Sequence, residues 1–487
     1  MNNQLNRYIS NTTVAALALG IAAATLVPWH FSNVAPFTAQ RIIQWITTCI
    51  ILATSGYLLR HALYIKISTA FHKKPLIITA TVLTLSAAST LLSPMPKLAF
   101  LELSYLTLLA ALTLLIAACT PQISDGGWRL TSIILSLLLL FYSVLATDHI
   151  SLTWGFANRH DFGPGFSNVR FFADVATGVM PLSLLYIVAR PRPSWEAAAL
   201  IALPLSIWWW MLWVSESRSA LLSILTSATL TFCIFGRAAR WPVATILTTA
   251  LIGLAGWWLL NPLTADDADY PFLRDIASSS GRLSLWVDAL RYSWQSFPIG
   301  IGPMGFSGDG YLRSAHAHNI FLNTAAEWGI PLAAALFLTL SLLAINVATK
   351  SKNIHKEKKP IYACTAMAFF STLINLQFAG AQVMPASAMT VALSFGLAAG
   401  FQSKTKTSYE HRSSSKTLPL KGTILWCTLM LMVYYMAIAG VELYNLSLES
   451  TMRCFELTGS FYQYPRFWLQ GRLECMQDVA PQHWLFQ

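Results

Sequence analysis

Long, uninterrupted apolar runs recur along almost the whole chain, and short polar segments separate most of them. The 487 residues are 55% hydrophobic and only 11% charged, whereas soluble domains carry about 25% charged residues. So few charged residues cannot cover the surface of a soluble protein of 487 residues. Lipid must therefore surround much of the chain. In lipid, only helices and closed barrels satisfy every backbone polar group. Because the apolar runs are continuous rather than alternating, the sequence predicts an all-α integral membrane protein.

The apolar runs predict one polytopic domain, residues 1–443, with about 12 to 13 transmembrane helices. The first run lacks a small-residue cleavage site, so we interpret it as a retained signal-anchor. A long loop, residues 261–318, lies between spans nine and ten, and a tail, residues 444–487, follows the last span. The candidate spans are residues 12–31, 42–59, 75–92, 98–118, 129–147, 171–189, 196–214, 220–235, 242–260, 332–348, 361–378, 386–401 and 422–443.

The distribution of positive charge predicts the orientation of these spans. If the N-terminus lies in the cytoplasm and the spans alternate, 20 of the 32 Lys and Arg residues fall in cytoplasmic segments. The positive-inside rule then places the long loop and the tail on the outer face, which is the periplasm of a bacterial inner membrane. Tryptophan clusters at residues 208–213 and 257–258 then fall at outer span ends, where we expect an aromatic belt.

Two of the seven cysteines, Cys454 and Cys475, lie together in the predicted outer tail. An oxidising periplasm favours a disulfide between them, and two free thiols are the alternative. The other five cysteines lie in or beside spans, where we expect ordinary packing. Because the chain has neither a CxxC motif nor a Cys/His cluster, we predict no metal site.

Three arginines border spans on the predicted outer face: Arg170, Arg218 and Arg282. Arg218 lies in a turn of about five residues between two apolar helices, so it must lie near the membrane surface. Charge at that depth is costly and is typical of functional sites. Arginine also forms bidentate bonds to phosphate oxygens, so three arginines around one cavity predict a lipid-linked diphosphate site. The alternative is snorkelling of each side chain to lipid headgroups. We interpret Arg291 and Arg313 as ordinary loop charges.

Two histidines, His316 and His318, lie just before a short apolar helix that Asn319 is suited to cap. The positive end of that helix disfavours imidazolium, so a neutral His318 is a candidate general base for a hydroxyl. His316 is a second candidate for this role or a neighbour that tunes it. A solvated histidine is the alternative, and no third ligand at useful spacing supports a metal site. We expect the acidic run at residues 266–269 to be a solvated loop rather than a divalent-ion site.

The glycines Gly300, Gly302 and Gly305 spell G-x-G-x-x-G without a preceding strand, and Pro303 interrupts them. This pattern is therefore not a dinucleotide site. We interpret it as a turn that leads from an amphipathic helix, residues 281–294, back toward His318. Backbone amides that face an anion are a further hypothesis for this turn.

The order SRSALL, SGRLSLW, PIGIGPMGF and AHAHNIFLNTAAEWGIP resembles the O-antigen ligase superfamily, which includes O-antigen polymerases and bacterial protein O-oligosaccharyltransferases. The motifs span residues 166–329. The resemblance implies a GT-C-like membrane glycosyltransferase that uses an undecaprenyl-diphosphate-linked glycan at the periplasmic face, without nucleotide sugar, metal or another cofactor. It assigns Arg218 and Arg282 to diphosphate binding and His318 to an essential role. Arg170 matches a looser motif.

The acceptor is less constrained. Lipopolysaccharide ligases typically end after twelve spans, whereas this chain adds a thirteenth span and an aromatic-rich tail. An added element on the acceptor side favours a bulky acceptor such as a pilin-like protein. The lipid A–core and a growing glycan are alternative acceptors. A lipid-glycan flippase is the alternative outside this class, but flippases carry charge pairs inside their spans, and these spans are nearly uncharged.

Overall fold

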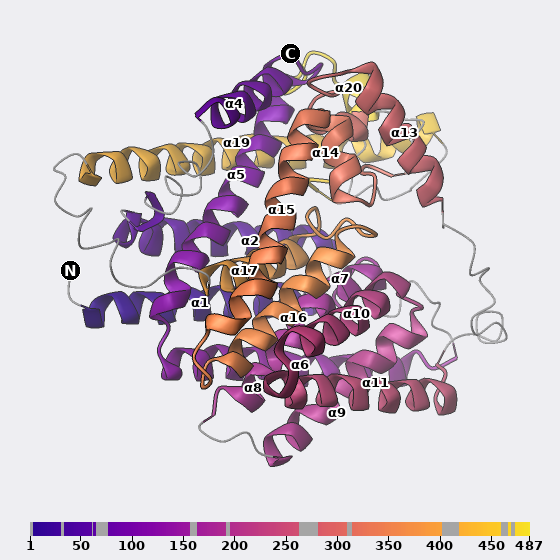
Figure 1. The fold of residues 1–487 in the computed structure, drawn as a ribbon. Coiled ribbons are helices and arrows are strands. Elements are labelled where there is room, and N and C mark those ends of the chain that lie inside the picture. The colour runs from indigo at the N-terminus through magenta and orange to yellow at the C-terminus, as the bar shows by residue number, and fades with distance from the viewer. Residues whose placement is uncertain are drawn as a thin grey trace. The chain divides into compact units, whose positions relative to one another are not determined.

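The computed structural model describes residues 3–30, 34–60, 62–64, 76–155, 163–190, 195–262, 281–308, 314–401, 418–458, 466–468 and 473–487. These ranges contain helices and turns and no strand (Figure 1). Eight helical runs within them are long and apolar enough to cross a membrane. The prediction of an all-α integral membrane protein is therefore confirmed.

A helix lies at each of the thirteen predicted spans, although these helices differ in length. One of the eight long runs, Arg218–Leu259, contains both α10 (Arg218–Phe235) and α11 (Arg240–Leu259), which the short 3-10 helix Gly236–Ala239 joins. The helices at predicted spans two, three, eleven and twelve are only 16 or 17 residues long. The number of membrane crossings therefore stays a prediction.

The chain divides into two compact units, and the first contains Met1–Ile51, Ile116–Ser278 and Ala344–Lys406. Helix α7 begins where Asn168 accepts a hydrogen bond from the backbone N–H of Arg170 (2.9 Å), and it ends at Ser183, two residues after Pro181. The other helices of this unit are α1 (Asn3–Leu26), α2 (Pro36–Ile51), α6 (Asp125–Leu152), α8 (Leu185–Val188), α9 (Trp195–Val214), α10, α11, α16 (Lys359–Asn375) and α17 (Pro385–Gly400).

Helices α9 and α11 lie side by side in the first unit (Figure 1). Their close approach depends on Gly253, because a Cβ atom there would lie 2.8 Å from the backbone nitrogen of Trp210 and 2.9 Å from the carbonyl oxygen of Ser206. At Gly256, one turn further along α11, a Cβ atom would make only an ordinary contact of 3.5 Å with the Trp210 ring.

Two tryptophans of α9 are buried inside the protein, whereas the side chains of an aromatic belt face the membrane interface. Trp208 and Trp209 are fully buried, and the Trp208 ring packs edge-on against Phe172 with ring centroids 4.9 Å apart. The Tyr142 ring contacts both, stacked 5.0 Å from Phe172 and edge-on 5.5 Å from Trp208. The prediction of a belt at residues 208–213 is therefore wrong for these two residues, because α9 is apolar on every side and its sequence does not reveal which side is packed.

The second unit contains Leu52–Leu115, Ser279–Leu343 and Thr407–Gln487. Helices α5 (Pro96–Cys119) and α15 (Ile330–Lys350) contribute residues to both units. A small apolar core, formed by Leu285, Ala289, Phe306, Ala317 and Ala326, joins α13 to α14 and to the loop before α14. The other helices of this unit are α4 (Leu76–Leu91), α13 (Arg282–Gln295), α14 (Ile320–Trp328), α19 (Leu418–Thr458) and α20 (Leu473–Val479).

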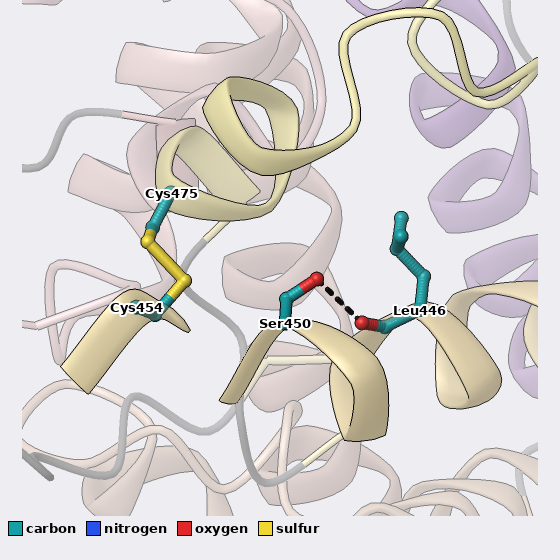
Figure 2. The surroundings of a disulfide bond; sticks show 4 residues. All are labelled: Leu446, Ser450, Cys454 and Cys475. Carbon is teal, nitrogen blue, oxygen red and sulfur yellow. Dashed lines mark hydrogen bonds between the residues drawn. A yellow bond between two sulfur atoms is a disulfide. The ribbon is translucent and has the colours of Figure 1, made fainter. Parts of the chain in front are cut away.

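The C-terminal segment is fastened to the end of α19. This helix continues to Thr458, so the boundary predicted between residues 443 and 444 lies inside one helix. A disulfide joins Cys454, near the end of α19, to Cys475 in α20 (Figure 2). One turn before the disulfide, the Ser450 hydroxyl donates to the Leu446 carbonyl (2.6 Å) within α19 (Figure 2).

Replacing Gly253 with alanine should destabilise the protein, by about 1–3 kcal/mol, because the added methyl group overpacks two backbone atoms of α9. Gly256→Ala is the matched control, since it gains the same helix propensity without the clash. The measurement is the melting temperature of each purified variant in detergent. Equal melting temperatures for the two variants would contradict the packing described for α9 and α11.

Candidate functional site

The predicted site residues fall on both units of the structure. Arg170 and Arg218 belong to the first unit, whereas Arg282 and the histidine pair belong to the second. The structure therefore brings Arg282 and the histidines into one unit. Convergence of all these groups on one ligand stays a prediction.

All three predicted arginines lie in the first turn of a helix. Arg218 and Arg282 are the first residues of α10 and α13, and Arg170 is the second residue of α7. The N-terminus of a helix carries partial positive charge and exposed N–H groups, which attract an anion. An arginine combined with a helix N-terminus is suited to a phosphate group.

The turn before α10 has an unusual backbone. Glu216 has a φ angle of 47°, in the left-handed region that residues other than glycine rarely adopt. The N–H of Arg218 donates to the Glu216 carbonyl (2.7 Å), and the hydroxyls of Ser215 and Ser217 lie 2.8 Å apart. This tight turn fixes where α10 begins and leaves the Arg218 side chain exposed.

The histidine loop, residues 314–319, also contains a left-handed residue. His318 has a φ angle of 52°, and such strain persists only where neighbouring contacts enforce it. Asn319 caps α14 as predicted, because its side chain accepts hydrogen bonds from the N–H groups of Phe321 and Leu322, both at 3.0 Å. His318 therefore stands immediately before the positive end of a helix. Its Nε2 atom lies 3.2 Å from the Ser314 hydroxyl.

Several side chains bind the backbone of the histidine loop. The Trp286 indole of α13 donates to the Ala317 carbonyl (3.0 Å), and the Ala317 N–H donates to the Asn323 side chain (3.0 Å). The Ala315 carbonyl accepts from the Ser307 hydroxyl at 3.2 Å. These contacts account for the left-handed backbone at His318, because they fix the residues that precede it.

Arg282 is connected to the histidine loop through α13. It lies one helical turn before Trp286, whose indole binds the carbonyl of the residue that precedes His318. Within the second unit, the candidate phosphate ligand Arg282 and the candidate base His318 therefore belong to directly contacting segments.

His316 has a structural role beside its neighbour. It is 1% exposed, and its Nδ1 atom accepts a hydrogen bond from the His318 N–H at 3.3 Å. Burial lowers the pKa of His316 well below its ordinary value, and the neighbouring His318 and Arg466 charges lower it further. His316 is therefore neutral, and its ring packs edge-on against the His318 ring with centroids 4.2 Å apart.

The glycine-rich segment forms the predicted turn between α13 and the histidine loop. The N–H groups of Ile301 and Gly302 donate to the carbonyls of Ala326 and Glu327, at 2.8 and 3.0 Å. These amides therefore satisfy the C-terminal end of α14, and the hypothesis that they face an anion is wrong. Gly300 has a φ angle of 73°, and a Cβ atom there would lie 2.6 Å from the Ala326 carbonyl oxygen.

A buried ionic cluster lies behind the histidine loop, and the sequence analysis did not identify it. The Arg466 guanidinium, 2% exposed, binds the carboxylates of Glu102 (3.0 Å) and Glu327. Glu327 also accepts hydrogen bonds from the Phe306 N–H (3.3 Å) and from the Asn323 side chain (3.0 Å). A single acidic residue in an otherwise apolar run, as at Glu102 and Glu327, is the signal that could have indicated it.

Burial raises the pKa of Glu327 to about 7, and Glu102 adds to this, although Arg466 opposes it. For Arg466, burial favours a lower pKa, but the two carboxylates outweigh burial and raise it. The cluster contains two carboxylates and one guanidinium, so an additional proton relieves its excess negative charge.

The first unit contains a second buried arginine that the sequence analysis did not identify. Arg41, 1% exposed, donates to the Gln44 side chain (2.7 Å) and to the Val383 carbonyl (2.6 Å). The Gln40 side chain donates to the Gly165 carbonyl at 3.1 Å. These bonds bring together the segments that start α2, α7 and α17, so Arg41 supports the same end of the unit where Arg170 lies.

The described residues contain no group of three or more His, Cys, Asp or Glu side chains that could hold a metal ion. The acidic run at residues 266–269 and Arg313 lie outside the described residues.

The raised pKa of Glu327 predicts how stability depends on pH. Between its ordinary value near 4.5 and about 7, folded Glu327 holds a proton that the unfolded chain has released. This contribution to stability is fully present below pH 4.5 and is lost as the pH rises through 7, with a size of about 3 kcal/mol. The melting temperature of the wild type should therefore fall from pH 5 to pH 8 relative to Glu327→Gln. A constant difference between the two proteins would contradict the raised pKa.

Residues 200–337 match a family model described as O-Antigen ligase. None of the curated proteins compared with the chain matches it. The matched range includes Arg218, Arg282 and the histidine loop. The match confirms the resemblance predicted from the motifs: residues 200–337 are similar to the O-antigen ligase family.

Proposed function

We propose that this protein transfers a glycan from an undecaprenyl-diphosphate carrier to a hydroxyl group at the periplasmic face of a bacterial inner membrane. The family match supports a membrane glycosyltransferase in general. Transfer from a diphosphate carrier is supported by where the charged and titratable side chains lie in residues 200–337. Arg218 and Arg282 lie at helix N-termini, and a left-handed histidine stands before a third such N-terminus.

The arginines bind the donor in this proposal. Arg218 and Arg282, with Arg170, bind the diphosphate, and the helix N-terminus beside each arginine adds partial positive charge. Each guanidinium donates paired hydrogen bonds to phosphate oxygens, which grow more negative as the sugar leaves. The arginines therefore stabilise the transition state more than the bound donor.

His318 is the general base. Its ring removes the proton of the acceptor hydroxyl while that oxygen attacks the anomeric carbon from the face opposite the diphosphate. The new bond joins the acceptor oxygen to the anomeric carbon, and the bond from that carbon to the phosphate oxygen breaks. Undecaprenyl diphosphate leaves, and the configuration at the anomeric carbon is inverted. Because diphosphate is a good leaving group, no metal ion is needed in this scheme, and positioning supplies most of the rate increase.

A protein hydroxyl is the acceptor that we propose, as in pilin glycosylation. The support is the C-terminal segment, which the disulfide fastens to α19 and which presents a folded element in the unit that carries His318. An O-antigen ligase acting on the lipid A–core and an O-antigen polymerase remain the alternatives. A flippase is the alternative of another class, and glycan transfer by the purified protein in detergent excludes it as the sole activity, since transport requires two compartments.

His318→Ala should lower glycan transfer by about 10²- to 10⁴-fold, which is the usual contribution of a general base. The measurement is glycan profiling of pilins and lipopolysaccharide in a deletion strain that carries either the wild type or the variant. The wild type should restore pilin glycosylation, and the variant should not, although both proteins accumulate equally. His355→Ala is the matched control, because His355 is exposed and lies in a basic turn far along the chain.

Retained transfer by His318→Ala would contradict the base role. Restoration of lipopolysaccharide glycans alone would contradict the protein acceptor and favour the ligase alternative.

Arg218→Ala and Arg282→Ala should each weaken donor use about 10- to 100-fold, because a charge-assisted hydrogen bond contributes roughly 1.5–3 kcal/mol. Arg291→Ala is the control on the same helix as Arg282, since Arg291 is 54% exposed and pairs with Asp288 at 3.1 Å. The measurement is kcat/KM for the lipid-linked donor in detergent. If Arg282→Ala and Arg291→Ala behave alike, Arg282 does not bind the diphosphate.

A further inference from the structure

Arg466 lies in the C-terminal segment, more than 100 residues after the matched family region, yet it is fully buried among acceptors. Its guanidinium binds Glu102 of α5, Glu327 of α14 and the Ala315 carbonyl (3.1 Å). A buried guanidinium with this many partners is held rigidly, because any displacement leaves a charge unpaired in a low-dielectric interior.

Two of these partners stand on opposite sides of the candidate base. Ala315 lies three residues before His318, and Glu327 lies near the end of the helix that follows it. Glu327 also binds the Asn323 side chain, which in turn accepts a hydrogen bond from the Ala317 N–H. One guanidinium therefore reaches the histidine loop by two routes, directly at Ala315 and through Glu327 and Asn323.

The neighbours of Arg466 are also fixed. The Trp468 indole donates to the Gly440 carbonyl of α19 (2.9 Å), and the Phe467 ring packs edge-on against Tyr105 of α5 with centroids 6.2 Å apart. The disulfide between Cys454 and Cys475 fastens the chain on both sides of residues 466–468. The C-terminal segment therefore presents Arg466 in a defined position.

We infer that Arg466 is a positioning residue for glycosyl transfer, which holds the histidine loop in the conformation that presents His318 to the acceptor hydroxyl. The inference rests on the proposed function, and it makes the C-terminal segment part of the catalytic machinery. Arginine is required because its planar fork reaches two carboxylates and a carbonyl at once, whereas the single ammonium of lysine cannot.

Arg466→Lys tests this inference while keeping the positive charge beside the carboxylates. The variant should accumulate like the wild type, with kcat lowered about 10- to 100-fold and KM for the lipid-linked donor changed less than about twofold. Arg453→Lys is the matched control, because Arg453 is exposed on α19, and it should keep the wild-type kcat. An unchanged kcat for a folded Arg466→Lys would overturn the inference.

A second variant tests the inference if Arg466→Lys does not fold. Replacing Arg466, Glu102 and Glu327 with glutamine removes all three buried charges together, so no charge is left unpaired. This variant should regain wild-type accumulation and still show the lowered kcat. Full recovery of kcat together with accumulation would mean that the cluster contributes only stability, which also overturns the inference.

Hydrogen exchange of the peptide that covers residues 314–323 gives a readout that needs no activity. The Ala317 and His318 amides should exchange at least tenfold faster in Arg466→Lys than in the wild type, while α13 is unchanged. Unaltered exchange would refute the positioning role. If the wild type transfers no glycan to any acceptor, the proposed function fails, and this exchange measurement still tests whether Arg466 holds the loop.

Discussion

A charge that is removed from water must be paired, and this constraint determines where the polar side chains of this protein lie. Only 11% of the residues are charged, and each buried charge named above has a specific partner that fixes backbone segments. Arg41 of α2 binds the Val383 carbonyl before α17, and Asp174 of α7 accepts a hydrogen bond from Asn375 of α16 at 2.8 Å. Arg466 connects the C-terminal segment to α5 and α14. In each case one buried polar group determines how segments far apart in sequence are arranged.

The same constraint explains why the candidate site is built from loops and helix starts. A helix N-terminus offers positive potential and N–H groups to an anion. Such an N-terminus lies beside a candidate site residue at four helices. An arginine lies in the first turn of α7, α10 and α13, and His318 precedes the Asn319 cap of α14. The backbone strain at Glu216 and His318 lies in the turns that precede two of these helices. The arrangement suits an anionic donor with a neutral acceptor, as glycosyl transfer from a lipid diphosphate requires.

The sequence predicts local features well and long-range features poorly. The apolar runs predict the helices, and Asn319 predicts its own cap, because both depend on a few adjacent residues. The order of motifs around Arg218 and His318 predicts the family. The pairing of Arg466 with Glu327 cannot be predicted, since 139 residues separate them and the isolated glutamate does not indicate which cation it binds. The burial of Trp208 also escapes prediction, because a helix that is apolar all round does not show which side is packed.

We propose that Arg282 and the histidine loop, both in the second unit, act on one lipid-linked diphosphate sugar. The most direct measurement is photo-crosslinking of the purified protein with an undecaprenyl-diphosphate donor that carries a small photoreactive group on its first sugar. We expect crosslinked peptides from both residues 281–288 and residues 314–323, and competition by unlabelled donor at both. Crosslinks confined to one of the two segments would contradict it.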